Sequence, residues 1–131
     1  MKAYTDIEQS KKLAEILPIE SADMWWSKNF IYYNPTAAIG ISAEYSNVYT
    51  YKFGEDDIPC WSLAALLDQL EDVVVDENGY NYQLQIIKEG LQYYLVYEGV
   101  DDFASYDTPL FDDLVDACVE MIVKVKEKDL L

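Results

Sequence analysis

The stretch from Val73 to Glu98 constrains the fold more than any other part of the chain, because two turn signals divide it into three short β-forming runs. Asn78-Gly79 is typical of a two-residue type I′ hairpin turn, which needs positive φ at both central positions. A second turn is predicted at Glu89-Gly90. The pattern therefore predicts a three-stranded antiparallel meander over about residues 73–98.

The two turns also predict which side chains share a face, because successive side chains of a strand point to opposite sides. The first turn would pair Val75 with Tyr82, and the second would pair Lys88 with Leu91. Both pairings place the same side chains of the middle strand on one apolar face. We expect that buried face to consist of Val73, Val75, Tyr82, Leu84, Ile86, Tyr93, Leu95 and Tyr97. The opposite face, which includes Tyr94, is mostly polar.

Three other segments carry the start signals of helices. Thr5 and Glu8 form a capping box for a first helix, which Pro18 ends. A second helix is predicted from about residue 59 to 71, where leucines recur at helical spacing behind a proline. A third is predicted to begin at Thr108-Pro109, since threonine is a favoured N-cap and proline is favoured at the first helical position.

The region between the first two helices has strand composition. Residues 30–33 are typical of a strand, and residues 38–43 and 48–53 are predicted to form a further hairpin. At 131 residues the chain has the usual size of one domain, and it contains no internal repeat. We therefore expect a single acidic α+β domain over residues 1–131, in which about three helices cover one face of a mainly antiparallel sheet.

The side chains that the sequence lacks argue against most enzyme classes. All nine cationic side chains are lysines, so the chain has neither arginine nor histidine. Histidine is the usual general base and the commonest metal ligand, and arginine is the bidentate ligand of phosphates and carboxylates. The glycines are isolated, and residues 74–85 lack the first and last carboxylates of a calcium loop. We expect no catalytic residue, no cofactor and no metal site.

Net charge is −16, and the excess lies in one part of the chain. Residues 54–120 contain 17 carboxylates and a single lysine, Lys88, whereas eight carboxylates and eight lysines lie outside that range. A surface of this charge repels nucleic acid and anionic lipid and attracts cationic partners. The alternative is that the acids serve only solubility.

The two cysteines, Cys60 and Cys118, are expected to be reduced and buried. Cys60 is predicted at a helix start, where a thiol can be activated, but the chain has no histidine to act as its base. The amino terminus shows no apolar signal region and no run of residues is long enough to span a membrane, so we expect a cytoplasmic protein.

Aromatic and acidic residues are the candidates for an interaction surface. Trp25 and Trp26 are adjacent, so on a strand one would be buried and the other exposed. Tyr94 is a second candidate anchor on the outward face of the meander. The acidic pairs that complete the candidate surface are Asp101, Asp102, Asp112 and Asp113.

Several segments are similar to known sequences: residues 58–67 (IPCWSLAALL), 115–122 (VDACVEMI), 7–18 (IEQSKKLAEILP) and 20–24 (ESADM). They resemble small proteins encoded in prophages and mobile elements of gut anaerobes. Those proteins have no established activity, so the resemblance implies a mobile-element context and no functional residues.

These observations lead to one expectation and two alternatives. We expect a non-catalytic accessory protein that binds another protein with a basic or apolar face, and that binds neither nucleic acid nor membrane. One alternative is a DNA mimic that inhibits a nucleic-acid-binding host protein, which would need a continuous ridge of carboxylates. The other is a carboxylate-based hydrolase, which would need a cleft where two acids converge beside a tryptophan.

Overall fold

The computed structural model describes residues 2–27, 30–33, 57–99 and 105–130. Their elements form two compact units: Tyr4–Ala65, which we call the amino-terminal unit, and Leu66–Leu131 with Met1–Ala3, which we call the carboxy-terminal unit. Helices and antiparallel sheets occur together, so the predicted α+β class is confirmed. The single domain predicted over the whole chain stays a prediction. The hairpin predicted over residues 38–43 and 48–53 lies outside the described residues.

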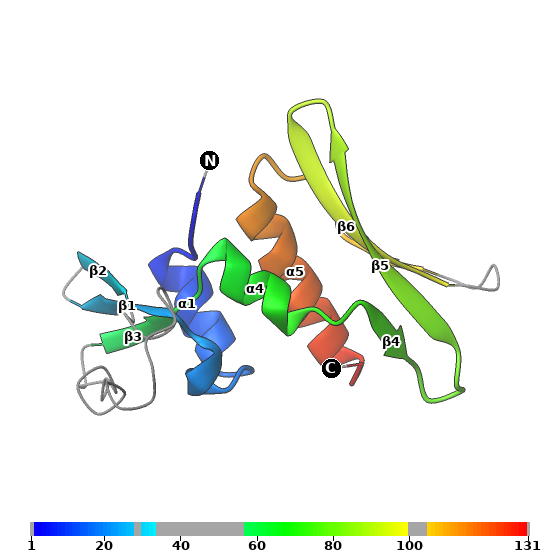
Figure 1. The fold of residues 1–131 in the computed structure, drawn as a ribbon, viewed down its shortest axis with the longest axis horizontal. Coiled ribbons are helices and arrows are strands. Elements are labelled where there is room, and N and C mark those ends of the chain that lie inside the picture. The colour runs from blue at the N-terminus through cyan, green and yellow to red at the C-terminus, as the bar shows by residue number, and fades with distance from the viewer. Residues whose placement is uncertain (1, 28–29, 34–56, 100–104, 131) are drawn as a thin grey trace, which may run out of the picture. The chain divides into compact units, whose positions relative to one another are not determined.

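In the amino-terminal unit, a short helix packs beside a sheet that has three strands within the described ranges (Figure 1). The elements are α1 (Ile7–Ala14), the 3-10 turn η1 (Ile19–Ser21), β1 (Met24–Ser27), β2 (Phe30–Tyr33) and β3 (Asp57–Cys60). β1 is the middle strand and pairs antiparallel with both others. The strand predicted at residues 30–33 is therefore confirmed. Leu13, Met24, Cys60 and Trp61 are buried at the core of this unit.

The helix α1 is capped one residue later than the sequence predicts. The carboxylate of Asp6 accepts a hydrogen bond from the backbone N–H of Gln9 at 2.8 Å, and Gln9 Oε1 accepts one from the N–H of Asp6 at 3.1 Å. Thr5, the predicted N-cap, is fully buried instead. Its Oγ1 accepts the N–H of Trp61 at 3.2 Å and lies 2.8 Å from Ser10 Oγ. The predicted capping box is wrong because tertiary contacts use the threonine hydroxyl.

The helix predicted from residue 59 is also wrong at its start, because residues 57–60 form β3. Pro59 lies opposite Trp25 at the edge of the described sheet, the position in a sheet where proline is tolerated. Helix α4 (Leu63–Gln69) begins after Ser62, whose Oγ accepts the N–H of Ala65 at 3.2 Å. Asp23 fixes this cap by accepting hydrogen bonds from both the N–H and the hydroxyl of Ser62.

In the carboxy-terminal unit, helix α5 (Leu114–Glu127) packs on one face of a four-stranded antiparallel sheet (Figure 1). The strands are β4 (Val73–Val75), β5 (Asn81–Glu89), β6 (Gln92–Gly99) and β7 (Tyr106–Asp107), and they lie side by side in that order. The first three strands form the predicted meander, which is therefore confirmed. β7 adds a fourth strand that the sequence analysis did not predict.

The first turn of the meander is one residue longer than predicted, and this changes the buried face of β4. Gly79 has φ +83°, but Asn78 is not among the described residues with positive φ, so the turn is not type I′. Asp76 and Tyr80 close a three-residue loop instead, with Gly79 N–H bonded to Asp76 O and Asp76 N–H bonded to Tyr80 O, both at 3.0 Å. Val74, not Val73 or Val75, therefore faces the core.

The second turn differs from the prediction by a shift that leaves the faces unchanged. Its central residues are Gly90 and Leu91, with Gly90 at φ +64°, as a type II′ turn requires. Lys88 consequently pairs with Tyr93 and not with Leu91. Because the register shifts by two positions in total, the same side chains stay on one face. Tyr82, Leu95 and Tyr97 are buried there, whereas Ile86 on the same face is 46% exposed.

The last helix begins later than the Thr108-Pro109 signal predicts. Thr108 is buried beside β6, where its Oγ1 accepts the N–H of Leu95 at 3.1 Å and donates to the carbonyl of Pro109 at 3.0 Å. Phe111 then pairs with Tyr93 before α5 starts at Leu114. Helical spacing predicts an apolar stripe of Leu110, Phe111, Leu114, Cys118, Met121, Ile122 and Val125. It is confirmed in part, because its last four members are buried in α5 and the first three are not. Val115, Ala117 and Val119 are buried as well.

Candidate functional site

The face of the four-stranded sheet opposite its buried residues is the candidate functional site, and we call it the outer face. The registers of β4 to β7 assign residues to it, because paired residues of neighbouring strands point to the same side. It consists of Val73, Val75, Asn81, Gln83, Gln85, Ile87, Glu89, Gln92, Tyr94, Val96, Glu98 and Asp107.

The outer face combines apolar, amide and acidic side chains. Val73 is 45% exposed and Val75 is 51% exposed, which is unusual for valines in a strand of a sheet. Amide side chains from β5 lie beside them, and Gln85 Nε2 donates to the Glu98 carboxylate at 2.8 Å. Every charged side chain assigned to this face is a carboxylate, so it attracts cationic groups.

The structure places the predicted interaction residues in different parts of the molecule. Tyr94 is half-buried on the outer face, as predicted, beside Ile87 of the neighbouring strand. Asp112 and Asp113 lie just before α5, where they accept hydrogen bonds from Gln92 Nε2 at 3.2 Å and from the backbone N–H of Lys2 at 2.7 Å. Asp101 and Asp102 lie outside the described residues.

The two tryptophans belong to the amino-terminal unit, in β1. The sequence predicted one buried and one exposed ring, but both are half-buried. Trp26 Nε1 donates to the carbonyl of Thr5 at 3.1 Å, and its ring makes an edge-to-face contact with Tyr4 at 5.8 Å between centroids. Trp26 thus has an intramolecular packing role.

The exposure of Val73 and Val75 was not predicted from the sequence. Three consecutive valines carry no alternation, so the side chains alone do not indicate which of them is buried. The length of the next turn decides the face, and the signal for a three-residue loop was Asp76. Its Oδ1 accepts the N–H groups of Asn78 and Tyr80 at 2.9 and 3.0 Å, as aspartate commonly does at the start of a turn.

The Asp76 side chain is also hydrogen-bonded to Tyr82, which lies at the start of β5. Its Oδ2 accepts the hydroxyl of Tyr82 at 2.9 Å, and the Tyr82 ring lies 5.0 Å from that of Tyr106. Desolvation acts to raise the pKa of Asp76, but the donors around the carboxylate outweigh it and lower the pKa. The hydrogen bond to Asp76 is the main reason why the pKa of Tyr82 is raised. A carboxylate held ionised in this way is unsuited to act as a general acid.

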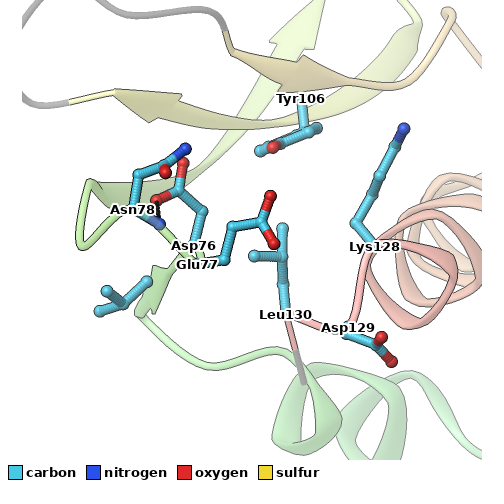
Figure 2. Close-up of a pocket in the computed structure, with 8 residues that line it drawn as sticks. Asp76, Glu77, Asn78, Tyr106, Lys128, Asp129 and Leu130 are labelled. Carbon is cyan, nitrogen blue, oxygen red and sulfur yellow. Dashed lines mark hydrogen bonds between the residues drawn. The ribbon is translucent and has the colours of Figure 1, made fainter.

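A polar hollow of about 510 Å³ lies next to this loop (Figure 2). Its lining residues are Val75, Asp76, Glu77, Asn78, Tyr106, Lys128, Asp129 and Leu130. Two acids of the loop are therefore near one acid and one lysine from the end of α5. No tryptophan is among these lining residues.

Both cysteines are buried and free. Burial raises the pKa of the Cys60 thiol, although the hydroxyls of Thr5 and Ser10 partly oppose the shift. Burial also raises the pKa of Cys118, to about 12. Both sulfurs are thus protonated at neutral pH, which suits core packing and not nucleophilic attack.

Two further findings concern metals and membranes. Within the described ranges, no three cysteine or carboxylate side chains come together in a way that could hold a metal ion. None of the helices in the part of the chain that the structure describes has both the length and the apolar composition to cross a membrane.

No protein-family model, no curated protein and no solved structure matches this chain.

Proposed function

We propose that this chain is a non-catalytic interaction module, an acidic accessory protein of a prophage or mobile element, that binds a basic surface of another protein. The observation that carries the proposal is the outer face, where the exposed Val73 and Val75 lie in a sheet whose outward charges are all carboxylates. Exposed apolar side chains bordered by charge are typical of protein-binding surfaces.

The charge of the surrounding unit supports a cationic partner. The carboxy-terminal unit contains 16 carboxylates and five lysines, a net charge of −11, whereas the amino-terminal unit contains nine carboxylates and four lysines, a net charge of −5. Charge of one sign raises the association rate with an oppositely charged surface and disfavours like-charged partners. Nucleic acid and anionic membranes are therefore not proposed as direct ligands.

The two alternatives from the sequence gain less support. The hollow beside Asp76 contains Lys128 as well as acids, and the Asp76 carboxylate is occupied by hydrogen bonds from its own loop. Neither feature favours hydrolysis. A DNA mimic requires a continuous ridge of carboxylates, and the outer face instead interleaves its acids with valines and amides.

The proposal is tested by selecting binding partners from a displayed library of random peptides and then measuring their affinity for the full chain by fluorescence anisotropy. We expect the selected peptides to be rich in lysine and arginine together with apolar residues, and to bind more weakly as salt is added. Selection of acidic or uncharged peptides would contradict the proposal. So would turnover of a small molecule that is abolished by neutralising one acid.

Two charge-reversal variants test whether the selected peptides bind the outer face. Glu98→Lys, on the outer face, should weaken the selected peptides by about fivefold. Glu20→Lys, at an exposed position of the amino-terminal unit, makes the same change in net charge and should leave affinity unchanged. An equal effect of both variants would mean that overall charge, and not the outer face, governs binding.

A further inference from the structure

The strand β4 forms one edge of the four-stranded sheet (Figure 1). The pattern of its hydrogen bonds to β5 leaves the backbone groups of two of its residues pointing away from the sheet. Leu84 N–H bonds to Asp72 O at 2.8 Å and Asp76 N–H bonds to Tyr80 O at 3.0 Å. In an antiparallel pair such bonds recur at every second residue. Val74 therefore directs its N–H and C=O groups toward β5, whereas the backbone groups of Val73 and Val75 point away from the sheet.

These outward groups are unpaired within the part of the chain that the structure describes. β4 pairs only with β5 there. The backbone groups of Val73 and Val75 point away from β5, and no backbone hydrogen bond to another described segment involves them. Two N–H and two C=O groups are thus presented in the plane of the sheet, flanked by half-exposed valine side chains. Such an edge is a template for a further strand.

The opposite edge of the sheet is protected by comparison. Lys124 Nζ donates to the carbonyl of Asp107 in β7 at 2.6 Å, and Pro109 follows two residues later with no N–H to offer. Lysine and proline are the residues with which proteins commonly block an edge strand. β4 contains neither.

The edge formed by β4 is also held in place before any partner arrives. The hydroxyl of Tyr97 donates to the carbonyl of Glu71 at 2.6 Å at one end, and the hydrogen-bonded loop of Asp76 fixes the other. Between them Val74 is only 1% exposed, so its side chain anchors the strand in the core. A strand held in this way loses little conformational freedom on binding.

The charges around β4 indicate what would pair with it. Glu71 and Asp72 precede the three valines, and Asp76 and Glu77 follow them. A second copy of β4 in antiparallel register would place Asp72 opposite Asp76 and Glu71 opposite Glu77, and like charges directly opposite one another destabilise a sheet. The same acids attract a strand that carries basic residues on both sides of an apolar centre.

We propose that β4 is a strand-addition site for an extended peptide segment with alternating apolar residues, bracketed on both sides by lysine or arginine. The inference rests on the proposed function, whose basic partner it describes more closely. The backbone of the segment would bond to Val73 and Val75, and its apolar side chains would extend the outer face beside theirs.

The first test uses the synthetic peptide Lys-Lys-Val-Thr-Val-Lys-Lys, acetylated and amidated at its ends, as the probe. A second peptide of the same sequence is N-methylated at both valines. This change keeps the charges and side chains but removes the two valine N–H groups that would donate to the edge of β4. We expect the full chain to bind the first peptide about tenfold or more tightly than the second. Equal affinities, or no binding of the first peptide, would overturn strand addition.

The second test changes the edge of the protein. Val75→Pro removes an outward N–H that the sheet itself does not use, and it should weaken the binding of the unmethylated peptide by about fivefold or more. Val75→Thr keeps both the N–H and the branched side chain and should preserve that affinity. Far-UV circular dichroism verifies that both variants fold. An unchanged affinity in a folded Val75→Pro variant would overturn the proposal.

A third measurement locates the contact and keeps the two proposals distinguishable. Amide hydrogen exchange by NMR should show the amides of Val73 and Val75 becoming protected when the peptide is added, with Val74 protected throughout. If the selected basic peptides bind the outer face without protecting these amides, strand addition is wrong and the proposed function stands. If the chain dimerises and Val75→Pro abolishes the dimer, the occupant is a second copy and the inference is overturned.

Discussion

The interior of the amino-terminal unit combines apolar side chains with a buried polar cluster, whereas the described interior of the carboxy-terminal unit is mainly apolar. In the carboxy-terminal unit, α5 buries an apolar stripe that includes Met121, Ile122 and Val125, and the sheet contributes the buried side chains of Leu95 and Tyr97. In the amino-terminal unit, two buried hydroxyls and a thiol lie within hydrogen-bonding distance of one another. They belong to Thr5, Ser10 and Cys60.

The difference predicts how each interior responds to change. An apolar core loses stability in proportion to the volume removed, because the surroundings relax only in part. A buried polar cluster loses more when one member is removed, because its partners keep their need for hydrogen bonds but have no water. The amino-terminal unit should therefore be the more sensitive of the two to small, isosteric substitutions.

The largest expected effect is that of Thr5→Val, which keeps the shape of the side chain but leaves the N–H of Trp61 and the hydroxyl of Ser10 without their partner. We expect the free energy of unfolding to fall by about 2 kcal/mol. All three tryptophans lie in the amino-terminal unit, so tryptophan fluorescence during urea denaturation reports on that unit.

The control for this substitution is Thr5→Ser, which keeps the hydroxyl and removes a methyl group. It should cost about 1 kcal/mol. A larger loss for Thr5→Ser than for Thr5→Val would show that packing, and not the polar cluster, stabilises this interior.

A smaller effect is expected for Ile122→Val in the carboxy-terminal unit. Removing one methylene from this fully buried side chain should cost about 1 kcal/mol. Far-UV circular dichroism follows the loss of helix, to which α5 contributes more than either α1 or α4 because it is longer. Glu120→Gln, at an exposed position of α5, should change stability by less than about 0.5 kcal/mol. A cost above that of Thr5→Val would reverse the proposed order of the two interiors.

The same two probes test whether the chain unfolds as one domain. If Thr5→Val shifts both the fluorescence and the circular dichroism transitions equally, the units unfold together, as the sequence predicts for a single domain. A shift confined to fluorescence would mean that the amino-terminal unit unfolds alone.

The smallest effect is expected at Asp76, where a polar network lies at the surface and water can replace lost partners. Its pKa is lowered in the folded protein, so the ionised form adds stability above the ordinary pKa of 3.8 and that contribution is lost as the pH falls below it. The wild type should therefore be more stable than Asp76→Asn at neutral pH, and the difference should narrow in acid. Urea denaturation at several pH values measures it, and a difference that is constant with pH would contradict the assignment.

Much of the secondary structure could be predicted from the sequence, but its boundaries could not. The meander and the stripe of α5 were predicted because alternation and helical spacing are local patterns. The predicted starts of α1, α4 and α5 were wrong. For α1 and α5 the reason is that Thr5 and Thr108 have a side chain suited to an N-cap, but their hydroxyls accept hydrogen bonds from backbone N–H groups that are distant in the sequence. Local propensity contains no term for such contacts.

The candidate site was predicted only in part, and for a related reason. Tyr94 was assigned to the outer face because a register shift of two positions does not change which side a residue faces. Val73 and Val75 were assigned to the core because a shift of one position does change it. The exposure of the Val73 and Val75 side chains therefore depends on a single residue in the length of the loop before Asn81.

Composition and short-range periodicity were enough to establish the antiparallel meander, the concentration of negative charge in residues 54–120 and the lack of histidine and arginine. Three features became evident only in the folded chain: which valine of β4 is buried, which threonines lie in the core and which edge of the sheet stays open. Thr5 and Thr108 are buried because their hydroxyls bond to backbone groups that are distant in the sequence. The buried valine is set by the length of the loop that Asp76 closes, which short-range periodicity does not indicate.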